Sequence, residues 1–214
     1  MKRVIPAILL ALGWAIYAHA EEPNLQTVQV ETDRQSIERG IDALMETCHT
    51  CHNLKYVKYR DLAALGIAKD KIDGWRGDQP LDAPLTGMMS DESAMQTFAK
   101  IPPDLSLMVK ARDGEENYLY SYLIGYYNKP DGTPSNHVFP ETKMPDPLGI
   151  SSASDDKSRK EIQDKARDVV SFLYWAADPH EQERHKLGYY VIGYLLVLTV
   201  LLFFLKQQIW SCID

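Results

Sequence analysis

Two cysteines and a histidine at a fixed spacing constrain this chain more than any other feature. Cys48, Cys51 and His52 form the sequence Cys-x-x-Cys-His, which is the attachment motif of c-type haem. Thiols one helical turn apart can reach the two vinyl groups on neighbouring edges of a porphyrin, and the histidine that follows directs a ring nitrogen at the iron as proximal ligand. The motif therefore predicts one covalently bound haem c, around which the rest of the domain would fold.

Other kinds of site also use Cys-x-x-Cys, and the rest of the sequence argues against them. A structural zinc site needs a second pair of ligands, but the remaining cysteine, Cys212, follows a long apolar run near the far end of the chain. A thioredoxin-like redox pair needs a βαβ context, which the sequence does not suggest. Within the motif, His49 is interpreted as a solvent-facing loop residue, because it cannot face the same iron as His52.

Both ends of the chain carry apolar segments that indicate a membrane. Residues 4–18 follow a short positive start and precede Ala18-His19-Ala20, which fits the small-x-small pattern of a signal-peptide cleavage site. Residues 187–205 are 19 consecutive uncharged positions, long enough as a helix, at roughly 28 Å, to cross a bilayer. The expected organisation is a signal peptide over 1–20, an exported haem domain over 21–186, a transmembrane helix over 187–205 and a cytoplasmic tail over 206–214.

The composition fits this organisation and excludes one class of partner. The chain has 214 residues, of which 45% are hydrophobic, and this suits one globular domain plus a short extra element. Its 23 Lys and Arg residues against 30 Asp and Glu give a net charge of −7, with no block of basic residues. Nucleic acid is therefore not expected as a partner, whereas membrane lipid is.

The spacing of apolar residues predicts a mainly α fold with long loops. Thr32 and Gln35 resemble a capping box at the start of the first helix. Sustained alternating patterns typical of strands are not visible, and the segments 66–85 and 128–152 are rich in Gly, Pro, Asp and Ser, as expected of loops. The predicted helices cover residues 33–47, 104–112, 115–126 and 161–177.

Haem iron has a sixth coordination position, and several side chains could fill it. The sequence favours Met144, because three nearby prolines stiffen an extended loop that can hold a side chain over a flat ring. Met108 lies in an apolar stretch and is interpreted as core. A thioether ligand raises the reduction potential of the iron relative to a second imidazole. The alternatives are an open site or another ligand among Met88, Met89, Met95, Met108 and His137.

Three segments in this order resemble the cytochrome c1 family, the haem subunit of the cytochrome bc1 complex. They are Cys48 to Leu62 (CHTCHNLKYVKYRDL), Ile101 to Gly114 (IPPDLSLMVKARDG) and Asp168 to Pro179 (DVVSFLYWAADP). The connection between Leu62 and Ile101 matches poorly. Where the family usually has Met-Ala-Pro-Pro, this chain has Met144-Pro145-Asp146-Pro147, so its ligand loop could follow a different path.

The resemblance implies a set of haem-binding residues. Thioether bonds would form at Cys48 and Cys51, and the axial ligands would be His52 and Met144. The resemblance also implies that Arg112 holds a haem propionate, with Tyr118 nearby. A cation makes chemical sense there, because a buried carboxylate needs a charge-assisted partner. The alternative for Arg112 is an exposed cation at a helix end.

The resemblance also implies a function and a location. The chain would be the cytochrome c1 subunit of quinol:cytochrome c oxidoreductase, relaying one electron from the Rieske iron–sulfur protein to a c-type cytochrome. Cytochrome b and the Rieske protein would be its partners in a dimeric complex, and no independent catalytic turnover is expected. The short leader favours a bacterial inner membrane with the haem domain in the periplasm. The alternatives are a haem subunit of another assembly, such as a terminal oxidase, or a haem-based sensor.

Overall fold

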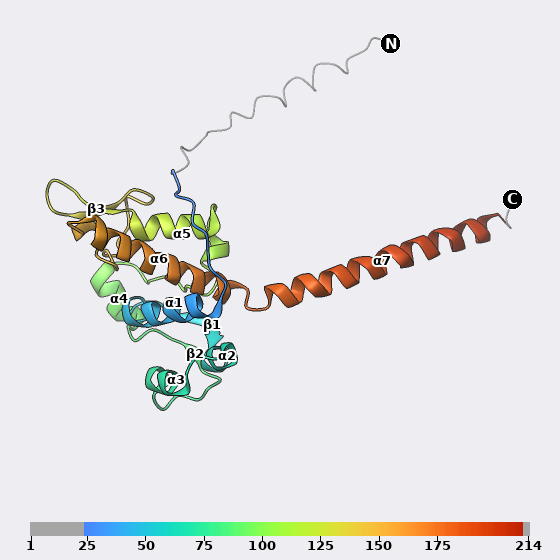
Figure 1. Cartoon of the computed structure of the whole chain (residues 1–214), viewed down its shortest axis with the longest axis horizontal. Helices are drawn as coiled ribbons and strands as arrows, with labels where there is room; N and C mark the ends of the chain where they lie inside the picture. The colour runs from blue at the N-terminus through green and yellow to red at the C-terminus, as the bar shows by residue number, and fades with distance from the viewer. Residues whose placement is uncertain (1–23, 212–214) are drawn as a thin grey trace, which may run out of the picture.

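Helices carry most of the part of the chain that the structure describes, residues 24–211 of a computed structural model (Figure 1). The described elements confirm the mainly α fold, and their short strands form two antiparallel pairs, β1 with β2 and β3 with β4. The predicted signal peptide over 1–20 and Cys212 lie outside the described residues. The elements are α1 (Arg34–Thr47), β1 (Leu54–Lys58), α2 (Tyr59–Leu65), α3 (Lys69–Arg76), β2 (Pro84–Leu85), α4 (Asp91–Phe98), the 3-10 helix η1 (Val109–Ala111), α5 (Glu115–Ile124), β3 (Tyr126–Asn128), β4 (Pro134–Asn136), the 3-10 helix η2 (Ile150–Ser152), α6 (Asp156–Ala177) and α7 (Glu181–Trp210).

Helix α1 begins one residue later than the sequence suggests and is capped by a different side chain. The Asp33 carboxylate accepts hydrogen bonds from the amides of Gln35 and Ser36, so Asp33 is the N-cap and the capping box expected at Thr32 is wrong. A carboxylate at this position also interacts favourably with the positive end of the helix dipole. Ile37 and Leu44 are buried on the face that the apolar spacing predicts.

The most extensive helix contact among the described residues is the crossing of α1 and α6, which lie side by side in the middle of the domain (Figure 1). At the crossing, a Cβ added to Gly40 would overlap the carbonyl group of Asp168 and lie 2.8 Å from Cβ of Phe172. Only a residue without a side chain lets the two backbones approach this closely. Phe172 is fully buried as a result and belongs to the main hydrophobic core.

An ion pair joins α1 to α6 at the solvent-exposed edge of the same crossing. Arg39 on α1 donates from Nε and Nη2 to the two carboxylate oxygens of Asp168 on α6, at 2.8 and 3.0 Å. This two-pronged geometry is the strong form of an arginine–carboxylate contact. The segment before α1 is fastened to α5 and α6, because the amides of Gln26 and Glu31 donate to the hydroxyls of Ser121 on α5 and Ser171 on α6.

The other three predicted helices also have different bounds in the structure. Helix α5 ends at Ile124, two residues before the predicted end, and Tyr126 begins β3. Residues 104–112 were expected to be helical, but they form an extended stretch, a turn and the 3-10 helix η1. The expectation is wrong because the side chains of Asp104 and Ser106 accept hydrogen bonds from the backbone of β1 and hold this stretch against it. Helix α6 begins five residues earlier than predicted, because Asp155 caps it through the amide of Ser158. Helix α3 lies within a segment expected to be loop.

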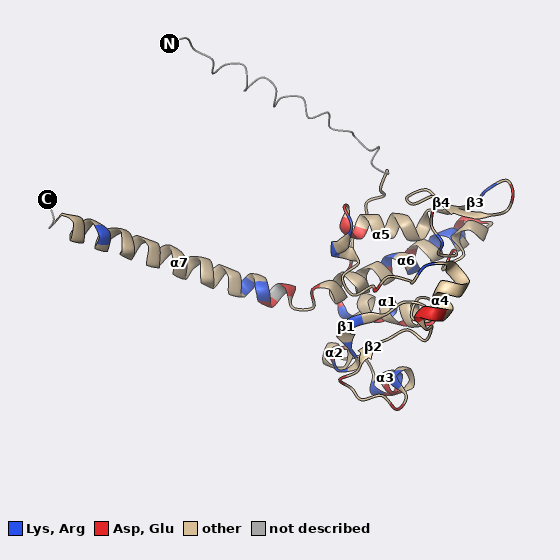
Figure 2. Cartoon of the chain, turned by 180° about the vertical axis from the view of Figure 1, so that it is seen from behind, with Lys and Arg blue, Asp and Glu red and all other residues tan. Residues whose placement is uncertain are grey.

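Helix α7 is a candidate membrane span. Within the span Glu183–Trp210, the most apolar window of 18 residues has a mean hydropathy of 2.2, and none of that window is buried against the rest of the chain. Figure 2 shows α7 projecting from the domain with charged residues near its two ends. At the junction with α6, Asp178 accepts hydrogen bonds from Lys110 at 2.9 Å and from Arg184 at 2.6 Å. Both cations lower the pKa of the Asp178 carboxyl, so this contact between domain and anchor is charged at neutral pH.

The Gly40 contact predicts a large effect of a single methyl group. Gly40→Ala should destabilise the domain by about 1–3 kcal/mol, because the new Cβ forces α1 away from Asp168 and Phe172. Thermal unfolding of the full chain in detergent, followed by circular dichroism, measures this change. Gly74→Ala is the matched control: nothing lies within 4 Å of a Cβ at this position in α3, so the control should gain about 0.4–1 kcal/mol. Equal effects of the two substitutions would contradict the proposed role of the crossing.

Candidate haem-binding site

The Cys-x-x-Cys-His motif lies on one turn directly after α1. Cys48 is the C-cap of α1, and its carbonyl accepts hydrogen bonds from the amides of Cys51 at 3.1 Å and His52 at 2.9 Å. These bonds close a helical turn, which places both sulfur-bearing residues and the histidine next to one another. Cys48 is buried and Cys51 half-buried, and both thiols are free. Burial raises the pKa of the Cys48 thiol, so it is protonated at neutral pH.

The structure orients the His52 ring by a hydrogen bond to a distant part of the chain. Nδ1 of His52 lies 2.8 Å from the carbonyl oxygen of Pro103, so Nδ1 carries the proton and Nε2 is left as the donor atom for a metal. Burial lowers the pKa of the ring, against smaller opposing effects of the Pro103 carbonyl and the Asp104 carboxylate. The neutral ring is the form that binds iron.

Residues 103–106 are fastened along residues 52–56 by a series of such bonds. The Leu105 amide donates to the Asn53 carbonyl at 2.8 Å. Asp104 Oδ2 accepts from the amide of Lys55 at 2.9 Å, and Ser106 Oγ accepts from the amide of Tyr56 at 3.1 Å. The Pro-Pro-Asp-Leu-Ser segment therefore serves as a support for the histidine. The sequence singled out this segment only by family resemblance and missed its role.

A second segment covers the motif from another direction. The Gly87 amide donates to Asn53 Oδ1 at 2.7 Å, and the Met89 amide donates to the Thr50 carbonyl at 3.0 Å. A Cβ at Gly87 would lie 3.0 Å from the carbonyl oxygens of both His49 and His52, so a side chain there would press on the motif. Asn53 thus joins the motif to both supporting segments. A polar residue directly after a haem motif is the only sequence signal for this role.

The predicted ligand Met144 is half-buried in a loop that is fastened at both ends. Before it, the fully buried Asn136 donates to the Tyr122 carbonyl at 2.7 Å and accepts from the amides of Val138 and Phe139. After it, Asp146 accepts from three backbone amides, those of Leu148, Gly149 and Ser151. The aspartate where the family usually has proline is therefore a local cap, which the sequence interpretation did not foresee. Pro145 restricts the backbone of Met144 itself.

The other predicted site residues occupy different surroundings. Arg112 is exposed, and its Nη1 donates to the neighbouring Ala111 carbonyl at 3.0 Å. Tyr118 is half-buried on α5 with its ring stacked on Tyr122, the two centroids 6.3 Å apart. Among the described residues, no hydrogen bond or ion pair joins Arg112 to Tyr118 or to the motif. The propionate contact implied by the resemblance stays a prediction.

The candidate residues for the sixth ligand other than Met144 have different surroundings in the structure. Met108 is buried in the main core, which confirms its interpretation as a core residue. Met88 and Met95 are 76% and 50% exposed, so their side chains point largely to solvent. His137 stacks on Tyr127 with ring centroids 4.2 Å apart. None of these observations displaces Met144 as the favoured ligand.

His49 corrects one sequence interpretation. It is only 6% exposed and not a solvent-facing residue, because residues 87–89 lie against the motif and cover it. Its Nε2 is buried with no hydrogen-bond partner in the described part of the chain. Burial lowers the pKa of the ring, which is consistent with a neutral imidazole.

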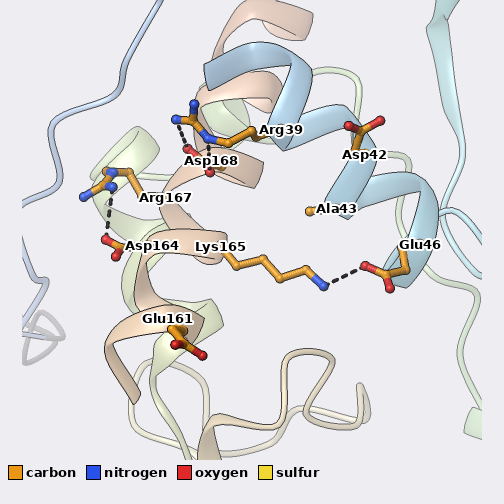
Figure 3. Close-up of a pocket in the computed structure, with 9 residues that line it drawn as sticks. All are labelled: Arg39, Asp42, Ala43, Glu46, Glu161, Asp164, Lys165, Arg167 and Asp168. Atoms are coloured by element: carbon orange, nitrogen blue, oxygen red, sulfur yellow. Dashed lines mark hydrogen bonds and ion pairs between the residues drawn. The ribbon is translucent and has the colours of Figure 1, made fainter. Parts of the chain in front are cut away.

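The open pocket between α1 and α6 is a charged surface whose groups already have partners. In Figure 3, Lys165 reaches Glu46 across the pocket and Arg39 reaches Asp168. Two of the five lining carboxylates, Asp42 and Glu161, pair instead with Lys71 and Lys157 outside the pocket. The lining charges therefore have ion-pair partners and leave no unpaired cluster for a ligand. The candidate site is therefore the motif with its supporting segments.

Comparison with known proteins gives the family. The model of the Cytochrome C1 family matches residues 24–85 and 73–213. Cytochrome c1 of Rhodospirillum rubrum is 30% identical, and the match covers 98% of this chain and 97% of the relative. The chain belongs to the cytochrome c1 family. Cytochrome c1 of Allochromatium vinosum is 28% identical with 98% of each chain covered, and the mitochondrial cytochrome c1 haem protein of Schizosaccharomyces pombe is 31% identical over 84% of this chain and 67% of the relative.

A solved structure is similar at lower identity. A chain of "Hyperthermophilic respiratory Complex III" is 18% identical, with a TM-score of 0.49 and coverage of 97% of this chain and 95% of that chain.

Membership of the cytochrome c1 family implies a haem cofactor, and the residues present fit one. Two free thiols lie within one turn of each other, and the adjoining histidine is neutral with Nδ1 already bonded. Within residues 24–211, no group of three or more His, Cys, Asp or Glu side chains could hold a metal ion. A multi-ligand zinc site thus finds no support among these residues, whereas haem needs only one histidine from the motif.

The burial of His49 predicts that its imidazole can be replaced. His49→Leu removes a nitrogen that is buried without a partner, so stability should be unchanged or rise by up to about 1–3 kcal/mol. The visible spectrum of the haem-loaded protein should keep its low-spin form, because His49 is not expected to bind iron. Thermal unfolding and absorption spectroscopy on the full chain check both points. Loss of the low-spin spectrum in His49→Leu would show that His49 takes part in ligation.

Proposed function

We propose that the protein relays single electrons within a quinol:cytochrome c oxidoreductase, from the Rieske iron–sulfur protein to a c-type cytochrome. The observation that carries this proposal is the motif turn, in which two thiols and an oriented, neutral His52 come together in a chain of the cytochrome c1 family. The chain is an oxidoreductase subunit, and we expect no independent turnover.

The haem, when bound, supplies an iron that changes its charge by one electron. Cys48 and Cys51 would hold its porphyrin by thioether bonds, and His52 and Met144 would be the axial ligands. The Pro103 carbonyl fixes the orientation of the His52 ring, as hydrogen bonds to the outer nitrogen do at other metal sites. Met144 would keep the iron reducible at a high potential, which suits acceptance of an electron from a Rieske centre.

Arg112, at the end of η1, would hold a haem propionate, with Tyr118 of α5 nearby. Arg112 is exposed, so its guanidinium is free to turn toward a carboxylate, which it would bind with charge-assisted hydrogen bonds. Tyr118 is half-buried and follows Arg112 by six residues. Both roles come from the family resemblance.

The chain is anchored in a membrane by α7, and we propose its orientation. A cleaved signal peptide over 1–20 would export residues 21–186 to the periplasm of a bacterium. Residues 187–205 would cross the inner membrane, and residues 206–214 would remain in the cytoplasm. The span Glu183–Trp210, which includes 187–205, is long and apolar enough to cross a bilayer. The anchor would lie beside cytochrome b in a dimeric complex.

Isolation from native membranes tests the assembly. A tagged chain purified in mild detergent should bring cytochrome b and a Rieske protein in equal amounts, with an untagged strain as control. The preparation should reduce a c-type cytochrome when supplied with quinol. Oxidase subunits in place of a Rieske protein would contradict the proposal and favour another electron-transfer assembly.

The motif predicts covalent attachment. After denaturation, mass spectrometry of the mature protein should show the mass of one haem retained on the chain. Cys48→Ala and Cys51→Ala should each weaken this attachment, because each removes one of the two thiols. A haem that is fully extracted into acidified organic solvent would contradict covalent binding.

The ligand loop predicts a second measurable property. Met144→Leu keeps apolar bulk but removes the sulfur, so the domain should fold while losing the sulfur-to-iron charge-transfer band. The reduction potential should fall on the order of 100 mV, since axial ligands alone span about 0.8 V. Spectra and redox titration measure both changes, and Met108→Leu, in the core, is the control that should leave them unchanged. Retention of the band in Met144→Leu would rule Met144 out as ligand.

A further inference from the structure

Three tyrosines at a spacing of four residues form a connected stack that begins on α5. The ring centroids of Tyr118 and Tyr122 are 6.3 Å apart with nearly parallel planes, and those of Tyr122 and Tyr126 are 5.5 Å apart at a steep angle. Residues four apart lie on the same side of a helix. Tyr126 is 4% exposed, so the stack leads from a half-buried edge of α5 into the protein.

The hydroxyl groups of this stack lead to the Met144 loop. Tyr126 donates to the Tyr122 oxygen at 2.9 Å, the Tyr122 oxygen lies 2.5 Å from Thr142 Oγ1, and the Met144 amide donates to Thr142 Oγ1 at 3.2 Å. A hydroxyl has one proton to donate and two lone pairs. Thr142 can therefore accept from both Tyr122 and Met144, and the bonds form one consistent series from Tyr126 to the backbone of Met144.

The Tyr122 residue also holds the beginning of the loop. Its main-chain carbonyl accepts from Asn136 Nδ2 at 2.7 Å, and the Asn136 carbonyl oxygen in turn accepts from the amides of Val138 and Phe139. One residue of α5 thus fixes the loop at two points, six residues apart along the chain. The second point is only two residues before Met144, and on the other side of Met144 the ring of Pro145 restricts its backbone.

We propose that Tyr122 is a positioning residue for the Met144 thioether, acting through Thr142. The proposal rests on the proposed ligation of iron by Met144. Removing the Tyr122 hydroxyl leaves the Tyr126 and Thr142 hydroxyls without their shared partner, which costs free energy unless the loop moves to let water reach them. The sulfur would then occupy its ligating position for a smaller fraction of the time, and the reduced iron would lose part of its stabilisation.

The test compares Tyr122→Phe with Tyr120→Phe in the haem-loaded full chain in detergent. Tyr120 is a half-buried tyrosine on the same helix whose hydroxyl has no hydrogen bond among the described residues, so it controls for the loss of a phenol. Tyr122→Phe should weaken the sulfur-to-iron charge-transfer band and speed hydrogen exchange of the Met144 amide about five- to tenfold. It should shift the one-electron redox equilibrium toward the oxidised form by up to tenfold, which is about 59 mV. Tyr120→Phe should change none of these.

Variants of Thr142 provide an independent test that does not alter α5. Thr142→Val removes the hydroxyl acceptor at nearly constant volume and should reproduce the effects of Tyr122→Phe. Thr142→Ser retains the hydroxyl, so the charge-transfer band, the potential and the amide exchange should stay close to those of the unsubstituted protein. If Tyr122→Phe and Thr142→Val leave the band, the potential and the amide exchange unchanged while Met144→Leu abolishes the band, the positioning role is overturned and the ligation stands. If the band survives in Met144→Leu, the ligation is wrong and the positioning proposal is overturned with it.

Discussion

The close approach of α1 and α6 at Gly40 is the contact on which the rest of the domain depends. The haem motif begins where α1 ends, and α7 follows directly after α6. The position of the motif relative to the membrane helix therefore depends on how these two helices cross, together with the Asp178 junction between α6 and α7. A buried Phe172 beneath the crossing and the Arg39–Asp168 pair at its edge hold that geometry from two sides.

The ring of His52 is held by a backbone group, the carbonyl of Pro103. The ring of His52 and the peptide groups around the motif are bonded to residues 87–89 and 103–106, which come from segments far along the chain. Backbone amides and carbonyls cannot rotate away as side chains do, so they hold the histidine in one orientation. The Met144 loop, in contrast to the His52 ring, is held by side chains, those of Asn136, Thr142 and Asp146. The two axial ligands proposed here thus rest on supports of different stiffness.

The sequence predicted the features that depend on local spacing and missed those that depend on distant partners. The motif spacing, the apolar stripe of α1 and the long uncharged run of α7 are local features, and the structure has the buried face of α1 and the apolar helix α7. Asp104 and Ser106 looked like the first turn of a helix, but their side chains bond to β1, about fifty residues earlier. His49 looked exposed because nothing in its own surroundings reveals that residues 87–89 cover it. The cap at Asp146 was visible only as a departure from the family pattern.

The pairing of β1 with β2 also bears on how this domain can change in length. The segment between β1 and β2, which contains α2 and α3, begins and ends at neighbouring points of the domain. Leu54 pairs with Leu85, and the Tyr59 amide donates to the Ala83 carbonyl. The β1–β2 pairing therefore holds the two ends of this segment together whatever its length. Doubling the length of such a loop costs only about 0.6 kcal/mol in loop-closure entropy. Insertions and deletions between α3 and β2 can accumulate there during evolution without moving the haem motif. The connection between Leu62 and Ile101, which matches the family poorly, overlaps this stretch.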